Sequence, residues 1–201
     1  MMWIGAGAGG VLGLLAALML VTVWHELGHL WVARRFKVPV KLIGLGVGPA
    51  IWRFRLRDDV RFEVRALPVG MVIGVIGRRG PDGQLRRPVA HDLAVAAGGP
   101  LASFILTVIL FLAALLTRAL PGLQIWLVYT GLLSAVASVL NLLPLPGLDG
   151  GHLFLLSLAQ VGLQLPPHLE VEVHHVGLRV TAIACLMVSI VMLGARLFGK
   201  G

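Results

Sequence analysis

Two histidines and a glutamate interrupt an apolar run near the start of the chain. They are His25, Glu26 and His29, in the stretch VTVWHELGHLW from Val21 to Trp31. On a helix, side chains four residues apart project from one face, about 40° apart around the axis. HExxH on a helix is typical of metalloproteases, in which both histidines bind zinc and the glutamate acts on the metal-bound water. The spacing therefore predicts Zn2+ ligands at His25 and His29 and a catalytic acid/base at Glu26.

Ionisable groups within an apolar segment need a reason to be there. Each costs a few kcal/mol at the centre of a bilayer on insertion scales, so such a group marks a functional site by default. The simpler alternative is a cluster of interfacial histidines paired with a carboxylate at a helix end. A catalytic zinc ion usually has three protein ligands and one open position. The protease interpretation therefore requires a third ligand.

Asp149 is the candidate for that ligand. Apart from Glu26, and from Asp92 at the start of the second apolar segment, it is the only acidic residue in the long apolar segments or at their ends. It lies in NLLPLPGLDGGH, residues 141–152, where prolines and glycines must break or distort a helix. Irregular backbone at membrane depth is tolerated where it is buried in protein or lines a wet cavity. A broken helix carrying an aspartate beside such a cavity fits a ligand from a second span.

Four apolar segments must position these residues. Hydrophobic residues make up 58% of the 201 residues and charged residues 13%, with a mean hydropathy of +0.92. These values indicate an integral membrane protein. Because a helix needs about 20 apolar residues to cross a bilayer, we expect spans near 6–33, 92–117, 123–146 and 176–197 in one domain, 1–201. The first segment lacks a basic n-region, so we expect it to stay as a span and not to be cleaved as a signal peptide.

The connection between the first two spans is strongly basic. Of the 17 lysines and arginines, 13 lie between Arg34 and His91, so the formal charge of +8 does not indicate a nucleic-acid partner. The positive-inside bias predicts a cytoplasmic position for residues 34–91, with both termini outside the cell membrane. The chain is thus expected to be a multi-pass protein of the cell membrane.

Within this connection, polarity alternates along the chain. WRFRLR at 52–57 and VRFEVR at 60–65 flank Asp58-Asp59, which is typical of a β-hairpin with one apolar and one basic face. We expect a membrane-associated β-structured loop over residues 38–77; the alternative is a solvated linker. The predicted fold class is an all-α integral membrane protein of four transmembrane helices, with this hairpin loop between the first and the second.

Together, the two motifs resemble the site-2 protease family of intramembrane zinc metalloproteases. The family combines HExxH on one span with N-x-x-P-x-P-x-x-D-G on a later one, and this chain has both in that order. The resemblance implies a membrane-associated β-structured loop after the first span. It also implies roles for five residues: zinc ligation by His25, His29 and Asp149, acid/base catalysis by Glu26, and a place in the substrate site for Asn141.

Further residues lie close to these motifs. GGPLAS at 98–103 resembles another family element, often GPxxN, but Ser103 stands where asparagine is frequent. His152 follows Asp149 by three residues and is either a partner of the ligands, a spare ligand or an interfacial packing residue. Many family members carry a PDZ or a CBS domain, whereas these 201 residues show neither, so we expect a compact form.

The predicted function is zinc-dependent hydrolysis of a peptide bond in or near the transmembrane segment of another membrane protein. The expected partners are that substrate, membrane lipid and a regulatory membrane protein. One alternative is a membrane zinc transporter, because intramembrane His and Glu clusters also build ion pathways. The other is a catalytically inactive membrane scaffold. The sequence shows one complete metal site and lacks the internal duplication of many transporters, which favours the protease.

Overall fold

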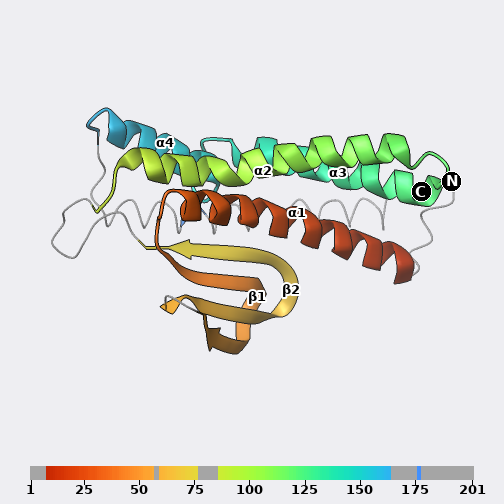
Figure 1. Cartoon of the computed structure of the whole chain (residues 1–201), viewed down its shortest axis with the longest axis horizontal. Helices are drawn as coiled ribbons and strands as arrows, with labels where there is room; N and C mark the ends of the chain where they lie inside the picture. The colour runs from red at the N-terminus through yellow and green to blue at the C-terminus, as the bar shows by residue number, and fades with distance from the viewer. Residues whose placement is uncertain (1–7, 57–58, 77–85, 164–175, 178–201) are drawn as a thin grey trace, which may run out of the picture. The chain divides into compact units, whose positions relative to one another are not determined.

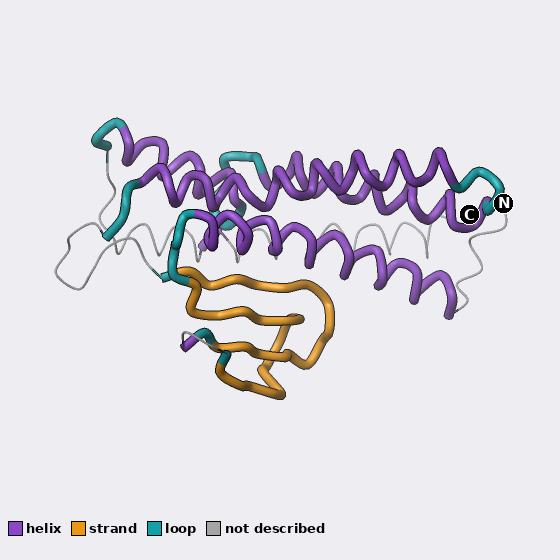
Figure 2. Tube along the Cα trace, in the orientation of Figure 1, coloured by secondary structure: helices purple, strands orange, loops and turns teal. Residues whose placement is uncertain are grey.

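The computed structural model describes residues 8–56, 59–76, 86–163 and 176–177. The chain divides into two compact units, Met1–Asn141 and Leu142–Gly201, and each is described by itself. The described elements follow one another along the chain (Figures 1 and 2) in the order α1 (Ala8–Arg35), β1 (Val40–Arg55), β2 (Arg61–Val75), α2 (Val89–Leu116), α3 (Pro121–Asn141) and α4 (Asp149–Gln160).

Three helices of the first unit are long and apolar enough to cross a membrane. They are α1, α2 and α3, with mean hydropathies of 1.8, 2.4 and 1.7 over their most apolar windows. These helices correspond to the first three predicted spans, whereas the fourth, 176–197, lies outside the described residues except for its first two. The third span was predicted to reach residue 146, but α3 ends at Asn141. Pro144 and Pro146 explain the earlier end, because the residue before a proline is disfavoured in the α conformation.

Helices α2 and α3 pack through buried hydroxyl groups as well as apolar side chains. Ser134 Oγ donates a hydrogen bond to the Ser103 carbonyl at 2.8 Å, and Ser138 Oγ donates one to the Pro100 carbonyl at 2.9 Å. Thr107 Oγ1 donates a hydrogen bond in the other direction, from α2 to the Gly131 carbonyl of α3, at 3.4 Å. Small and hydroxyl-bearing residues are common where membrane helices pack closely. The apolar core beside them is formed by Val21, Leu106, Leu110, Ala114 and Leu127.

The crossing of α1 and α2 depends on two glycines. A Cβ at Gly28 would run into the Gly98 carbonyl oxygen and come within 2.5 Å of the Ala102 Cβ. A Cβ at Gly98 would lie 2.8 Å from the Gly28 carbonyl oxygen. Both positions therefore require glycine for the two backbones to approach this closely.

Strands β1 and β2 form one long, bent antiparallel hairpin. They have 16 and 15 residues, with register running from Val40 opposite Val75 to Arg55 opposite Arg61. Residues 42–45 also lie opposite residues 61–64, so the hairpin folds back on itself, as the curled strands in Figures 1 and 2 show. The predicted hairpin is confirmed and spans most of residues 38–77. The predicted fold class, all-α, was too narrow. The sequence showed alternating polarity only in the outer half of the hairpin, residues 52–65, where one face of the sheet is polar.

The sheet is attached to both of the neighbouring helices. The Gly70 N–H donates to the Met19 sulfur at 3.3 Å, which joins β2 to α1. Arg87 donates to the Ile76 carbonyl at 2.8 Å and forms an ion pair with Asp92 at 2.6 Å, which joins the end of β2 to the start of α2. The sheet is therefore part of the first unit and not a solvated linker.

In the second unit, an irregular loop leads into α4. Leu148 is the N-cap of this helix, and the preceding Gly147 has a φ of 93°, which favours glycine. A Cβ at Gly150 or at Gly151 would collide with carbonyl oxygens of the loop, those of Leu143 and Leu145 respectively. The glycines after Asp149 thus allow the loop to fold tightly against the first turn of α4. The predicted break in the helix is confirmed.

Candidate metal centre and active site

The two histidines of HELGH direct the same ring nitrogen at one another. The helix α1 is continuous through the motif, and the Nε2 atoms of His25 and His29 are 3.3 Å apart, with their rings edge to face. Two nitrogens bound to one tetrahedral zinc ion, each about 2.05 Å from it, are also about 3.3 Å apart. The predicted pairing of His25 and His29 is therefore reproduced with a spacing that fits two ligands of one zinc ion.

Hydrogen bonds from helix α2 orient both rings. His29 Nδ1 lies 2.7 Å from the Val95 carbonyl oxygen, and His25 Nδ1 lies 2.9 Å from Ser103 Oγ. Because a carbonyl oxygen only accepts, His29 Nδ1 must carry a proton, so in the neutral ring Nε2 has the lone pair that a metal can bind. Partners of this kind fix the orientation of metal-binding histidines and raise their basicity.

Ser103 has a role that the sequence left open. Its side chain is completely buried, and its carbonyl accepts hydrogen bonds from Ser134 and Thr107, which hold this part of α2 in place. In this position the hydroxyl supports His25. The GGPLAS stretch was the signal that could have indicated this role, because it resembles a family element whose last residue is polar.

Gly99 provides the space in which the two Nε2 atoms meet. A Cβ there would lie 2.6 Å from His25 Nε2 and even closer to His29 Nε2. The neighbouring Gly98 instead allows α1 and α2 to approach each other at Gly28, so the two adjacent glycines face different groups. The sequence did not indicate that Gly99 faces the two histidines, because glycine carries no functional group to search for.

Glu26 lies in the same turn of α1 as the histidines. It follows His25 directly and is partly buried. Consecutive residues of a helix are about 100° apart around the axis, so Glu26 leaves the helix in a different direction from His25. Its predicted role as acid/base remains a prediction.

Asn141 and Asp149 belong to different units of the chain. Asn141 is the last residue of α3 and is three residues after Ser138, whose bond to the Pro100 carbonyl holds this end of α3 against α2. Asp149 is the first residue of α4, where a carboxylate is favoured by the helix dipole. His152 follows it on the same side of α4, three residues later. The functions predicted for Asn141, Asp149 and His152 remain predictions.

Comparison with protein families identifies one match over most of the chain. The model of peptidase family M50 matches residues 13–119 and 118–188. The two matched ranges contain HELGH and NLLPLPGLDG and all the described strands and helices apart from the first residues of α1. The match thus includes every residue that the sequence singled out for the site.

Individual relatives match a shorter part. Regulator of sigma E protease of Salmonella typhimurium strain LT2 is 35% identical over 98 residues, which are 45% of this chain and 22% of the relative. Regulator of sigma-E protease RseP of Escherichia coli K12 is 33% identical over 98 residues, with the same shares. Zinc metalloprotease Rip1 of Mycobacterium bovis BCG is 28% identical over 124 residues, which are 57% of this chain and 30% of the relative. The chain therefore spans less than a third of the length of each.

Proposed function

The chain belongs to peptidase family M50, and on this premise we propose that it is a zinc metalloprotease of the site-2 type. Its proposed reaction is hydrolysis of a peptide bond in or near the transmembrane segment of a membrane protein. The observation that carries the proposal is the 3.3 Å spacing of the Nε2 atoms of His25 and His29, with Nδ1 of each engaged by α2. Two of the relatives reported above are named proteases and the third is named a zinc metalloprotease, which supports the same chemistry.

We propose Asp149 as the third protein ligand of the zinc ion, beside His25 and His29. It lies at the position of the aspartate in the second family motif, and at the start of a helix that follows an irregular loop. Three protein ligands leave one position for water, as a catalytic zinc site requires. Bound zinc would polarise the scissile carbonyl and lower the pKa of a water toward about 7.

Glu26 is the proposed acid/base. A carboxylate in this position accepts a proton from the attacking water and delivers it to the leaving amine, which contributes about 10² to 10⁴ in rate. Zinc binding needs the histidines and the third ligand, whereas proton transfer needs Glu26. The two tasks can therefore be separated by substitution.

The substrate segment must be extended before it is cut, because a helix hides its carbonyls in i to i−4 hydrogen bonds. A strand edge of the β1–β2 sheet could hold the unwound segment by β-augmentation. Asn141 would donate hydrogen bonds to the substrate backbone or to the developing oxyanion. A regulatory membrane protein remains a proposed partner for the selection of substrates.

The decisive experiment uses the full chain reconstituted in lipid with a tagged single-pass substrate. The parent protein should cleave the substrate, and Glu26→Gln should lower the rate at least 100-fold while it keeps its zinc, measured by elemental analysis. Asp59→Asn, an acid-to-amide change at the exposed end of the hairpin, should leave cleavage unchanged. Asp149→Ala should lose zinc. Zinc flux without cleavage would instead favour the transporter, and neither activity would favour the scaffold.

A further inference from the structure

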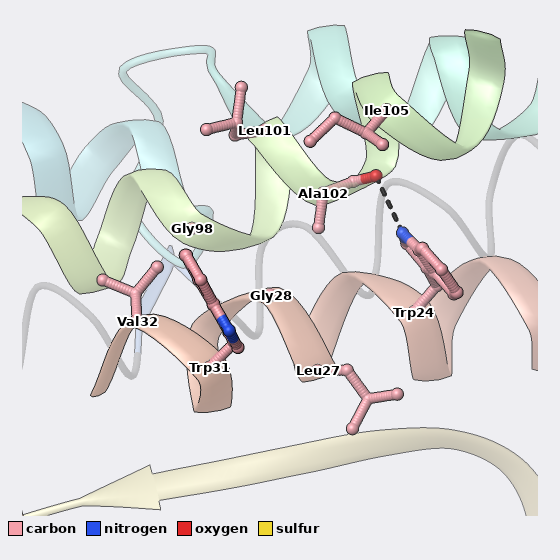
Figure 3. A pocket seen from close by; sticks show the side chains of 9 residues that line it. All are labelled: Trp24, Leu27, Gly28, Trp31, Val32, Gly98, Leu101, Ala102 and Ile105. Carbon is pink, nitrogen blue, oxygen red and sulfur yellow. Dashed lines mark hydrogen bonds between the residues drawn. The ribbon is translucent and has the colours of Figure 1, made fainter. Parts of the chain in front are cut away.

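Helices α1 and α2 line a partly open apolar cavity on one side of their crossing. Its volume is about 340 Å³. Figure 3 shows its walls, Trp24 and Trp31 from α1 and Leu101 and Ile105 from α2, with Gly28 and Gly98 between them. Trp24 Nε1 donates to the Ala102 carbonyl at 3.0 Å, which fixes the indole at one end. The indole of Trp24 is therefore hydrogen-bonded across the helix crossing, and the cavity lies entirely within the first unit.

This cavity opens on the outer surface of two membrane-spanning helices. The exposed fractions of Trp31 and Leu101 are 71% and 60%. In a bilayer, such a surface faces lipid. Trp24, Gly28 and Trp31 follow one another at spacings of four and three, so they share a face of α1, and Arg35, four residues after Trp31, continues that face. The cavity therefore lies along the face of α1 that continues to Arg35, at the C-terminal end of this helix.

That end of α1 carries a group of exposed cations. Arg34, Arg35 and Lys37 are all exposed within four residues of chain. The helix ends in a Schellman motif, with Val38 N–H donating to the Ala33 carbonyl at 2.8 Å and Lys37 N–H to the Arg34 carbonyl at 3.2 Å. Lys37 occupies the left-handed position of this motif, with a φ of 53°, where glycine is usual. A positive charge is therefore present where backbone geometry favours glycine.

We propose that the cavity binds one acyl chain of an anionic phospholipid, with the headgroup phosphate held by Arg35 and Lys37. Lysine and arginine at the end of a span attract anionic headgroups, and tryptophan is enriched at the same level of the membrane. The cavity is lined by apolar side chains and two glycines, a lining that suits an unbranched acyl chain. This site does not depend on the proposed protease activity.

Native mass spectrometry of the full chain tests the headgroup part of the proposal. The protein is loaded with dioleoylphosphatidylglycerol or with dioleoylphosphatidylcholine, and the retained lipid is counted. We expect the anionic lipid to be retained preferentially. Arg35→Gln combined with Lys37→Gln should weaken that retention about 25-fold, or about fivefold for each charge. Arg118→Gln, which removes an exposed cation just beyond the far end of α2, should change it by less than twofold.

A second pair of variants tests the cavity. Leu101→Trp should fill it and reduce retention of both lipids, and Ile105→Trp, one turn further along α2, serves as an independent filling variant. Leu112→Trp is the matched control, because Leu112 has a similar exposed fraction of 56% and does not line the cavity. Size-exclusion chromatography shows whether each variant is folded.

Several results would overturn the proposal. Equal retention of the two lipids, or equal losses in the Arg35/Lys37 and Arg118 variants, would refute the headgroup contact. Unchanged retention in both filling variants would refute the acyl-chain site, and displacement of lipid by a single-pass substrate would reassign the cavity to protein docking. Glu26→Gln should bind lipid like the parent, so failure of this proposal and failure of the protease proposal can be told apart.

Discussion

Gly99 faces the Nε2 atoms of His25 and His29, so a residue without a functional group provides the space between the two proposed zinc ligands. Both histidines and their spacing could be predicted from the sequence, because HExxH places them on one face of a helix. The contribution of Gly99 could not, since it depends on the helix crossing at Gly28 and Gly98. Ser103 is intermediate, because its polarity was visible in the sequence but its contact with His25 was not.

Gly99→Ala is therefore expected to weaken zinc binding. The added methyl group would lie 2.6 Å from His25 Nε2, so one ring must move away from its partner. We expect at least a tenfold loss of zinc affinity, a size typical of changes to groups that support metal ligands. Competition with a chelator of known affinity measures this loss.

Two other glycines provide the controls for this prediction. Gly122→Ala, where the new methyl group meets nothing within 4 Å, should bind zinc like the parent. Gly98→Ala should lower the unfolding temperature, because its methyl group would lie 2.8 Å from the Gly28 carbonyl oxygen. Full zinc affinity in Gly99→Ala would contradict the arrangement of the two Nε2 atoms around this glycine.

At the scale of elements, the sequence predicted what periodicity and composition control. Three long apolar helices and the hairpin could be predicted because apolar runs and strict alternation are local patterns. The fold-back of the hairpin and the separate helix α4 were not predicted. Pairing of residues 42–45 with two segments of β2 is a non-local contact, and α4 begins where Gly150 and Gly151 let the loop turn back on itself.

The junction between the sheet and α2 depends on one buried ion pair. The side chains of Arg87 and Asp92 are each 11% exposed, and Arg87 also donates to the Ile76 carbonyl. Arg87→Met would leave the Asp92 carboxylate buried without this partner, which we expect to cost about 3 to 5 kcal/mol in the free energy of unfolding. Denaturant unfolding of the purified protein measures this loss.

A double variant and a surface control test whether the loss of stability comes from the buried ion pair. Arg87→Met combined with Asp92→Leu should recover part of the loss, because neither charge then remains buried alone. Arg55→Met removes an exposed pair with Asp59, whose side chains are 74% and 80% exposed, and should cost less than about 1 kcal/mol. If Arg87→Met and Arg55→Met were equally stable, the buried pair would not be what joins the sheet to α2.

For the whole molecule, the concentration of charge predicts an orientation in the membrane. Of the 13 lysines and arginines between Arg34 and His91, two lie in the last turn of α1 and 11 in the connection between α1 and α2. From the positive-inside bias we expect this connection in the cytoplasm and the short connection between α2 and α3 on the outer side. The HELGH motif, in the last three turns of α1, would then lie toward the cytoplasmic side.

Single-cysteine variants test that orientation. In a Cys185→Ala background, Asp59→Cys lies at the exposed end of the hairpin and Arg118→Cys lies between α2 and α3. A membrane-impermeant maleimide added to intact cells should label Arg118→Cys and leave Asp59→Cys unlabelled until the membrane is opened. The reverse pattern would place the basic connection outside. Labelling of both positions from one side would mean that α2 does not cross the membrane. The membrane environment that we assign to the two histidines and to the lipid cavity would then be wrong.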